Sequence, residues 1–77
     1  MEKDLIEYIV KSLVDDPASV DIQVIDENQS TVLELRVGEG DIGKVIGKHG
    51  RIAKAMRTVL AAVSSKNSRR MILEICD

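Results

Sequence analysis

The segment 45–50, Val-Ile-Gly-Lys-His-Gly, decides how the rest of the chain is interpreted. Its two glycines, Gly47 and Gly50, stand three positions apart and enclose two basic side chains, Lys48 and His49. Glycine lets a backbone turn sharply and lets a ligand approach the main chain closely. A cationic Gly-x-x-Gly link between two predicted helices therefore indicates an anion-binding loop. Single-stranded nucleic acid, held by its phosphates, is the natural ligand.

Charge is distributed unevenly around this segment. Residues 1–41 hold 11 acidic and three basic side chains, whereas residues 42–73 hold eight basic side chains and no acidic one. The net charge of −2 is therefore the sum of strongly opposed halves. Such a dipole favours a nucleic-acid partner. An ordinary solvated basic face would show the same pattern, and charge alone does not separate the two interpretations.

Composition predicts one small domain covering residues 1–77. The core must be aliphatic, because Tyr8 is the only aromatic residue, and this argues against base stacking on a sheet of the RRM kind. Cys76, the only cysteine, is most simply a small apolar strand residue. The sequence shows neither a signal peptide nor an apolar run of membrane-spanning length, so we expect a cytoplasmic protein without a cofactor or a metal.

The hydrophobic pattern predicts an α+β fold. A polar turn at 27–30 would join the first two predicted strands, 20–24 and 31–37, into an antiparallel hairpin. Asp41 is a plausible N-cap of a short helix over 42–46. A loop at 64–68 precedes the last strand, which should run parallel to the second strand because a crossover joins them. The expected order is α-β-β-α-α-β, with a three-stranded mixed sheet packed against three helices. The elements are helices over 3–14, 42–46 and 51–63, and strands over 20–24, 31–37 and 71–76.

A second glycine pattern, 38–43 (Gly-Glu-Gly-Asp-Ile-Gly), matches the G-x-G-x-x-G motif of dinucleotide-binding folds. With Lys44 it also matches part of a P-loop. Glu39 and Asp41 would repel a pyrophosphate, and Val45 stands where a P-loop needs Ser or Thr. The chain is also too short for either complete fold. We therefore predict no nucleotide site here.

Residues 45–51, which add Arg51 to the opening segment, resemble the signature of the KH domain, and the element order is similar to the type II variant. The chain length and the segment 13–17, Leu-Val-Asp-Asp-Pro, resemble the KhpA family of small bacterial RNA-binding proteins over essentially the whole chain. The resemblance implies an RNA-binding protein, such as an RNA chaperone or post-transcriptional regulator, that forms homodimers and pairs with a larger KH protein, KhpB. An enzyme is not expected, since no cluster of catalytic side chains accompanies His49.

In KH domains the glycine loop clamps the backbone of about four nucleotides. The resemblance implies that Gly47 and Gly50 shape this loop and that Lys48 and His49 meet phosphates. Bases would lie beside the short helix, where Ile42 is a further candidate wall, and Lys66, Arg69 and Arg70 could extend the basic track. The wall residues could equally be core residues, and the outlying bases could be solvated surface charge. The other candidates for RNA contact are Arg51, Lys44, Val45, Ile46, Lys54 and Arg57.

The predicted long helix carries an apolar arc wider than one core needs, including five consecutive apolar residues at 59–63. We therefore expect a dimer that uses this helix, with Ala53 and Leu60 at the edge of the arc near the contact. The alternative is that the whole arc is buried under the sheet. A dimerising protein-interaction adaptor with incidental RNA affinity is the competing functional class.

Overall fold

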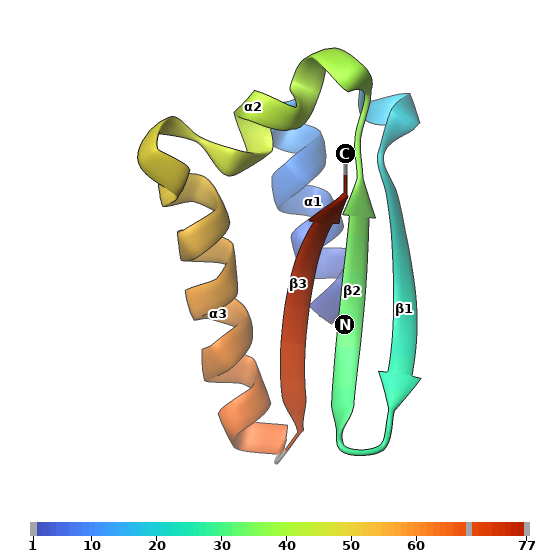
Figure 1. Ribbon diagram of the computed structural model, residues 1–77, viewed down its shortest axis with the longest axis vertical. Coiled ribbons are helices and arrows are strands. Elements are labelled where there is room, and N and C mark those ends of the chain that lie inside the picture. Colours follow the sequence, from blue (N-terminus) through green and yellow to red (C-terminus); the bar gives the residue numbers. More distant parts are fainter. Residues whose placement is uncertain (1, 68, 77) are drawn as a thin grey trace.

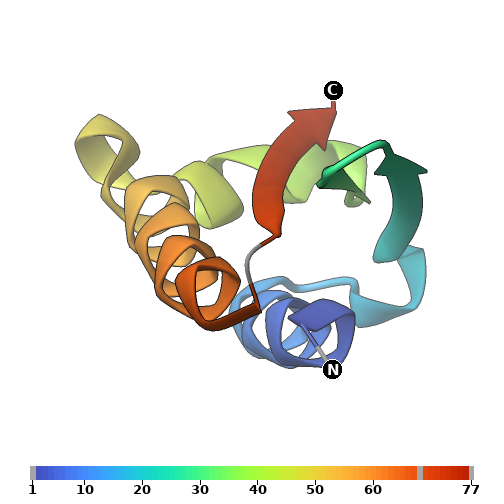
Figure 2. The same cartoon turned by 90° about the horizontal axis from the view of Figure 1, so that it is seen from below.

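The computed structural model describes residues 2–67 and 69–76, and the side chains of all of these except 65–67. Three strands form one sheet, and two long helices lie on the same side of it, as Figure 2 shows. The short helix α2 crosses one end of the molecule and leads into α3 (Figure 1). The helices are α1 (Glu2–Leu13), α2 (Ile42–Ile46) and α3 (Arg51–Asn67), and the strands are β1 (Asp21–Glu27), β2 (Ser30–Arg36) and β3 (Arg70–Cys76).

The sheet has the order β1-β2-β3, with β1 antiparallel and β3 parallel to the central strand β2. This confirms the predicted mixed sheet, the crossover and the order α-β-β-α-α-β. The last paired residues of β1 and β2 are Glu27 and Ser30, so only Asn28 and Gln29 form the turn of the hairpin. Asn28 has a φ of 46°, a conformation that asparagine tolerates better than most residues. The turn is therefore two residues long instead of the predicted four.

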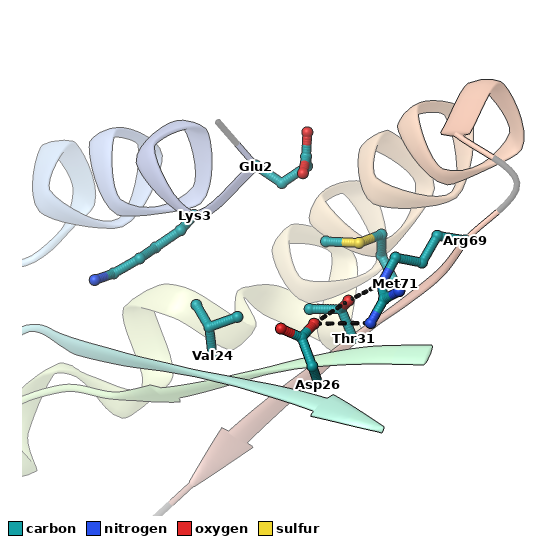
Figure 3. Close-up of a pocket in the computed structure, with 7 residues that line it drawn as sticks. All are labelled: Glu2, Lys3, Val24, Asp26, Thr31, Arg69 and Met71. Atoms are coloured by element: carbon teal, nitrogen blue, oxygen red, sulfur yellow. Dashed lines mark hydrogen bonds and ion pairs between the residues drawn. The ribbon is translucent and has the colours of Figure 1, made fainter. Parts of the chain in front are cut away.

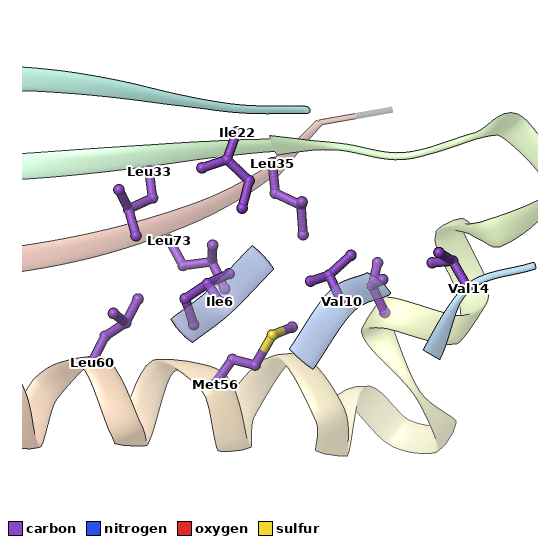
Figure 4. Packing of buried hydrophobic residues seen from close by; sticks show 10 residues of the cluster. Ile6, Val10, Val14, Ile22, Leu33, Leu35, Met56, Leu60 and Leu73 are labelled. Carbon is purple, nitrogen blue, oxygen red and sulfur yellow. The ribbon is translucent and has the colours of Figure 1, made fainter. Parts of the chain in front are cut away.

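The core lies between the sheet and the two long helices (Figure 4). Leu33 and Leu35 of the central strand are fully buried, and they face Ile6 and Val10 of α1 and Leu60 of α3. This cluster is entirely apolar, as the aliphatic composition predicts. Its ten members are Ile6, Val10, Val14, Ile22, Leu33, Leu35, Val45, Met56, Leu60 and Leu73.

Helix α3 extends to Asn67, so the predicted helix end at residue 63 and the predicted loop at 64–68 are wrong for residues 64–67. Residue 68 lies outside the described residues. The polar run after residue 63 forms the last helical turn because its groups find local partners. The Ser64 hydroxyl donates to the Ala61 carbonyl at 3.1 Å, and the Arg69 N–H donates to the Ser64 carbonyl at 3.2 Å. None of the helices in residues 2–67 is long and apolar enough to span a bilayer.

Candidate nucleic-acid interface

The GKHG loop, Gly47–Gly50, is a sharp turn between α2 and α3. Gly47 has φ 79° and ψ 169°, and Gly50 has φ 73°, so both glycines occupy conformations that other residues rarely adopt. The Gly47 N–H donates to the Gly43 carbonyl at 2.9 Å, and the Gly50 N–H donates to the Gly47 carbonyl at 3.0 Å. Between them His49 itself has a positive φ of 59°. The loop is thus a defined structure held by its own backbone.

Gly47 is also required by its surroundings. A Cβ atom at this position would lie 2.6 Å from Cγ1 and 2.9 Å from Cβ of Ile52, in the first turn of α3. Such distances are far below van der Waals contact. The missing side chain therefore allows the end of α2 to pack directly on the start of α3. Nothing lies within 4 Å of the position that a Cβ of Gly50 would take, so Gly50 is required by its conformation alone.

The side chains of Lys48 and His49 are exposed between these glycines. Arg51 and Lys54, on the first turns of α3, are exposed as well. The positive end of the dipole of this 17-residue helix lies at the same place. The sequence-predicted cations of the loop and of the start of α3 are thus brought together at one end of the molecule.

Arg57 follows two turns after Arg51 and lies near β3. Its Nε and Nη2 atoms donate to the backbone carbonyl of Leu73 at 3.4 Å each. Strand β3 lies at the edge of the sheet, with a neighbouring strand on one side only. The Leu73 carbonyl, which accepts from Arg57, therefore lies at the free edge of the sheet, next to α3. Arg57 therefore joins the basic surface of α3 to the free edge of the sheet.

The short helix divides its apolar side chains between core and surface. Val45 is fully buried in the core cluster, whereas Ile46 is 36% exposed and Ile42 is half-buried. Of the two interpretations that the sequence allows for Val45 and Ile46, core residue or groove wall, the structure assigns the first to Val45. Ile46 remains on the surface beside the GKHG loop.

Lys44, a predicted RNA contact, lies in ion pairs with two carboxylates. Its Nζ is 2.6 Å from Oδ2 of Asp15 and 3.3 Å from Oδ1 of Asp41. Asp41 also accepts hydrogen bonds from the backbone N–H groups of Asp15 at 3.1 Å and Asp16 at 3.0 Å. We call these four residues the Asp41 cluster.

Asp41 precedes α2 as predicted, but its carboxylate forms no capping hydrogen bond with that helix. The predicted N-cap position is therefore confirmed, but the side chain does not cap the helix, because the carboxylate turns to the backbone after α1 instead. The pKa of Asp41 is lowered, mainly by the hydrogen bond from the Asp15 N–H and further by the Asp16 N–H and by Lys44. Burial acts in the opposite direction and raises this pKa, but it does not outweigh them. Hydrogen bonds to Asp15 and Asp41 raise the pKa of Lys44. Sequence reasoning missed this cluster, although the Asp-Asp-Pro sequence after α1 supplies two of its four residues, Asp15 and Asp16.

The outlying bases of the predicted basic track lie at the other end of α3 and at the start of β3, about 25 Å from the GKHG loop along a helix of this length. There Arg69 donates to the Asp26 carboxylate at 2.9 Å and to the Thr31 hydroxyl, as Figure 3 shows. It also donates to the Ser30 carbonyl at 3.3 Å. Arg69 thus holds the hairpin end against the start of β3, and Arg70 pairs with Ser30 across the sheet. The prediction that they extend the basic track from the loop is not supported by this placement. The side chain of Lys66 lies outside the described residues.

Ala53 and Leu60, the predicted dimer contacts, are 4% and 0% exposed. Both side chains are buried within the domain, Leu60 as part of the core cluster, so their prediction as interface residues is wrong. For this part of the apolar arc of α3 the predicted alternative, burial within the domain, is therefore correct. Another part of the arc remains open, since Val59 is 39% exposed and Ala55 is exposed. It belongs to an apolar α1–α3 groove lined by Ile9, Leu13, Arg51, Ile52, Ala55, Met56 and Val59.

The family model of the KhpA/KhpB KH domain matches residues 3–75 of this chain. The chain belongs to the KhpA/KhpB family of KH domains. This membership confirms the resemblance drawn from the glycine segment and the element order, and it agrees with the expectation that the protein is not an enzyme.

Relatives named RNA-binding protein KhpA match over nearly their full length. The protein of Borreliella burgdorferi is 55% identical over 99% of this chain and 93% of its own length. That of Clostridium acetobutylicum is 52% identical over 95% of this chain and 97% of its own length. The protein of Treponema pallidum is 48% identical over 100% of this chain and 96% of its own length.

Solved structures of Era share the fold. A structure of Aquifex aeolicus Era bound to GDP and AlF4− matches with a TM-score of 0.63 and 17% identity, covering 96% of this chain and 29% of that chain. A structure of Era in complex with MgGDPNP and nucleotides 1506–1542 of 16S ribosomal RNA matches with a TM-score of 0.61 and 17% identity, over 96% of this chain and 28% of that chain. The chain thus corresponds to less than a third of the length of these Era chains.

Proposed function

We propose that this chain is a single KH domain that binds single-stranded RNA by holding its backbone on the GKHG loop. The observation that carries the proposal is the geometry of that loop. Two glycines with positive φ enclose two exposed basic side chains at the start of a 17-residue helix. The names of the KhpA relatives, which describe RNA-binding proteins, support the choice of ligand.

In this proposal each part of the loop has one task. Gly47 shapes the loop by letting α2 pack against Ile52 of α3, and Gly50, where a Cβ would point into open space, keeps side-chain bulk away from the path of the RNA backbone. Lys48 supplies a charge to a phosphate oxygen, and His49 supplies a hydrogen bond. The positive end of α3 adds a favourable potential for the same phosphates. Arg51, Lys54 and Arg57 continue the basic surface along α3, and Ile46 offers an apolar contact to a base.

Few phosphates are neutralised in this arrangement, on the order of three to five, so binding is weak and depends on salt. For single strands the logarithm of the affinity should fall with the logarithm of the salt concentration with a slope of about −0.7 per phosphate. A weak, backbone-directed contact suits a cytoplasmic RNA chaperone or post-transcriptional regulator that acts on many transcripts.

Pairing with a second KH protein would add RNA contacts and raise the effective affinity. The α1–α3 groove supports this part of the proposal, because Leu13 and Val59 are both exposed and lie on neighbouring helices. Burial of such aliphatic side chains contributes roughly 25 cal/mol per Å². We propose that a second copy of this chain, or a KhpB-like protein, covers the groove, with Ala55 and Val59 in place of Ala53 and Leu60.

The dimer is tested by sedimentation of Val59→Asp beside Lys54→Asp. Both variants add a carboxylate to exposed positions of α3, but only Val59 lines the groove. Val59→Asp is expected to sediment as a monomer at concentrations where the wild type and Lys54→Asp sediment as dimers. A wild type that remains a monomer at every concentration would contradict a homodimer.

The same groove supports a second candidate function, a dimerising adaptor whose RNA affinity is incidental. Both functions are tested by crosslinking RNA to Lys48→Asp with His49→Asp in cells. We expect this double variant to lose crosslinked RNA and to melt near the wild-type temperature, because both side chains are exposed. It should still recruit the protein partner. Undiminished crosslinking in the folded double variant would contradict the clamp and favour the adaptor.

A further inference from the structure

Asp41 is the only side chain in the described part of the chain that is both charged and buried, with 3% of its surface exposed. A buried carboxylate is costly unless every oxygen finds a donor. It has no part in the phosphate clamp, since it is acidic and precedes α2. Its burial in a domain of this size therefore calls for a separate explanation.

Three donors converge on this carboxylate. Oδ1 accepts from the Asp15 N–H at 3.1 Å and faces Lys44 Nζ at 3.3 Å, while Oδ2 accepts from the Asp16 N–H at 3.0 Å. Asp15 and Asp16 lie 26 and 25 residues before Asp41 in the chain. One side chain thus joins the backbone after α1 to the residue directly before α2.

The helix that follows Asp41 cannot hold its direction alone. α2 has five residues, far fewer than an isolated helix needs for stability. The buried side chain of Val45 and the packing of Gly47 against Ile52 anchor its middle and its end, and the Asp41 cluster anchors it through Asp41, directly before the helix, and through Lys44. The backbone that Asp41 holds is itself fixed, because Val14 directly before it belongs to the core. Gly47 follows immediately after α2, so the direction of α2 sets where the GKHG loop stands.

We propose that Asp41 is a positioning residue for the GKHG loop, because its buried carboxylate ties α2 to the end of α1. The inference rests on the proposed RNA-binding function of that loop. In this role Lys44 completes the cluster and is not primarily a phosphate contact. Preorganising a loop lowers the conformational entropy lost on binding, so a loosened α2 weakens RNA binding without removing any RNA contact.

Electrostatics alone predicts the opposite sign, and this makes the inference testable. Asp41→Asn removes a negative charge near an RNA surface and should strengthen binding if charge alone mattered. The cluster predicts weaker binding, because an asparagine has one acceptor oxygen for two N–H donors and presents its own NH2 group to one of them. Glu39→Gln is the matched control. It makes the same change in charge two residues away, at an exposed side chain for which the described structure contains no hydrogen bond or ion pair.

The experiment measures the affinity for a fluorescent single-stranded RNA oligonucleotide and amide hydrogen exchange of the free protein, both well below the melting temperature. We expect Asp41→Asn to bind RNA about five- to tenfold more weakly than Glu39→Gln. Exchange at residues 47–50 should be accelerated by a larger factor than exchange at Leu33 and Leu35 in the central strand, which speeds up only as far as the variant loses global stability. A purely structural role would not produce this difference between loop and strand. Equal affinities of Asp41→Asn and Glu39→Gln would overturn the inference.

Two further variants keep the outcome clear. If Asp41→Asn does not fold, Lys44→Met removes one donor of the cluster, and faster exchange at residues 47–50 is expected without RNA. Wild-type exchange in Lys44→Met would then overturn the inference. The clamp itself is judged by Lys48→Asp with His49→Asp. Retained binding in that variant contradicts the proposed function, while the exchange data still decide whether Asp41 positions the loop.

Discussion

Two glycine-bearing segments follow each other in this chain and behave differently. In the segment 38–43 no glycine has a positive φ, and the charged side chain of Asp41 turns inward to the backbone after α1. In the GKHG loop both glycines have a positive φ, and the charged side chains stand in solvent. The first segment fastens the protein to itself, whereas the second presents cations to a ligand.

The comparison teaches that glycine spacing has to be judged together with the charge of the intervening residues. The spacing of 38–43 matches a dinucleotide motif as well as 47–50 matches a KH loop. The intervening residues Glu39 and Asp41 are acidic, and Lys48 and His49 are basic. That difference predicted which segment could meet phosphates, and the backbone conformations now follow the same division.

The largest expected effect is that of Gly47→Ala. The new Cβ would overlap with Ile52, and the backbone conformation with φ 79° and ψ 169° is unfavourable for alanine. We expect a loss of roughly 3 kcal/mol in the free energy of unfolding, measured by urea denaturation. A loss below about 1 kcal/mol would show that the loop is not held in this conformation.

The next effect is that of Asp41→Asn, and it depends on pH. The N–H of Asp15, together with Asp16 and Lys44, lowers the pKa of Asp41 in the folded protein. A carboxyl group with a lowered pKa stabilises the fold above its ordinary pKa of 3.8 and loses this contribution as the pH falls through the folded-state value. The stability difference between wild type and Asp41→Asn should therefore be constant from about pH 5 to pH 8 and shrink in acid. If the difference in the free energy of unfolding between wild type and Asp41→Asn stayed constant as the pH was lowered, an ionised Asp41 in the folded protein would be contradicted.

Gly50→Ala should cost less than Gly47→Ala, about 1 kcal/mol, because no atom lies near the new Cβ and only the φ of 73° opposes it. Gly50→Asn tests that reason, since asparagine adopts this conformation more readily and should restore part of the stability. Equal losses for alanine and asparagine in urea denaturation would assign the requirement to something other than φ.

The smallest effect, of opposite sign, is expected for Gly43→Ala. Gly43 lies inside α2 with an ordinary φ, and nothing lies within 4 Å of the position of a Cβ. Alanine should therefore stabilise the protein by up to about 1 kcal/mol, because it restricts the unfolded chain and favours a helix. If Gly43→Ala instead lowered the free energy of unfolding in urea, glycine would be required in the segment 38–43 as well, and the contrast with the GKHG loop would not hold.

Local patterns were sufficient to predict the fold. Alternating and helical periodicity predicted the three strands and the three α-helices, and the position of the GKHG loop followed from its glycines. The errors arose where long-range contacts decide. Asp41 binds backbone 25 residues away, and the burial of Ala53 and Leu60 depends on how α3 is rotated against the sheet. The division of Val45 and Ile46 between core and surface has the same origin, because neighbouring residues on a short helix differ only in which face the tertiary fold covers.

The central claim, that the GKHG loop holds the RNA backbone, is tested most directly by comparing Lys48→Asp with Lys11→Asp. Both replace an exposed lysine by aspartate and change the net charge equally, but Lys11 lies on α1, paired with Glu7 at 3.3 Å. The measurement is the affinity for a single-stranded RNA at fixed low salt. We predict that Lys48→Asp weakens binding about tenfold or more, whereas Lys11→Asp changes it by less than about threefold. Equal losses in the two variants would contradict the claim, because they would show that RNA responds to the net charge and not to the loop.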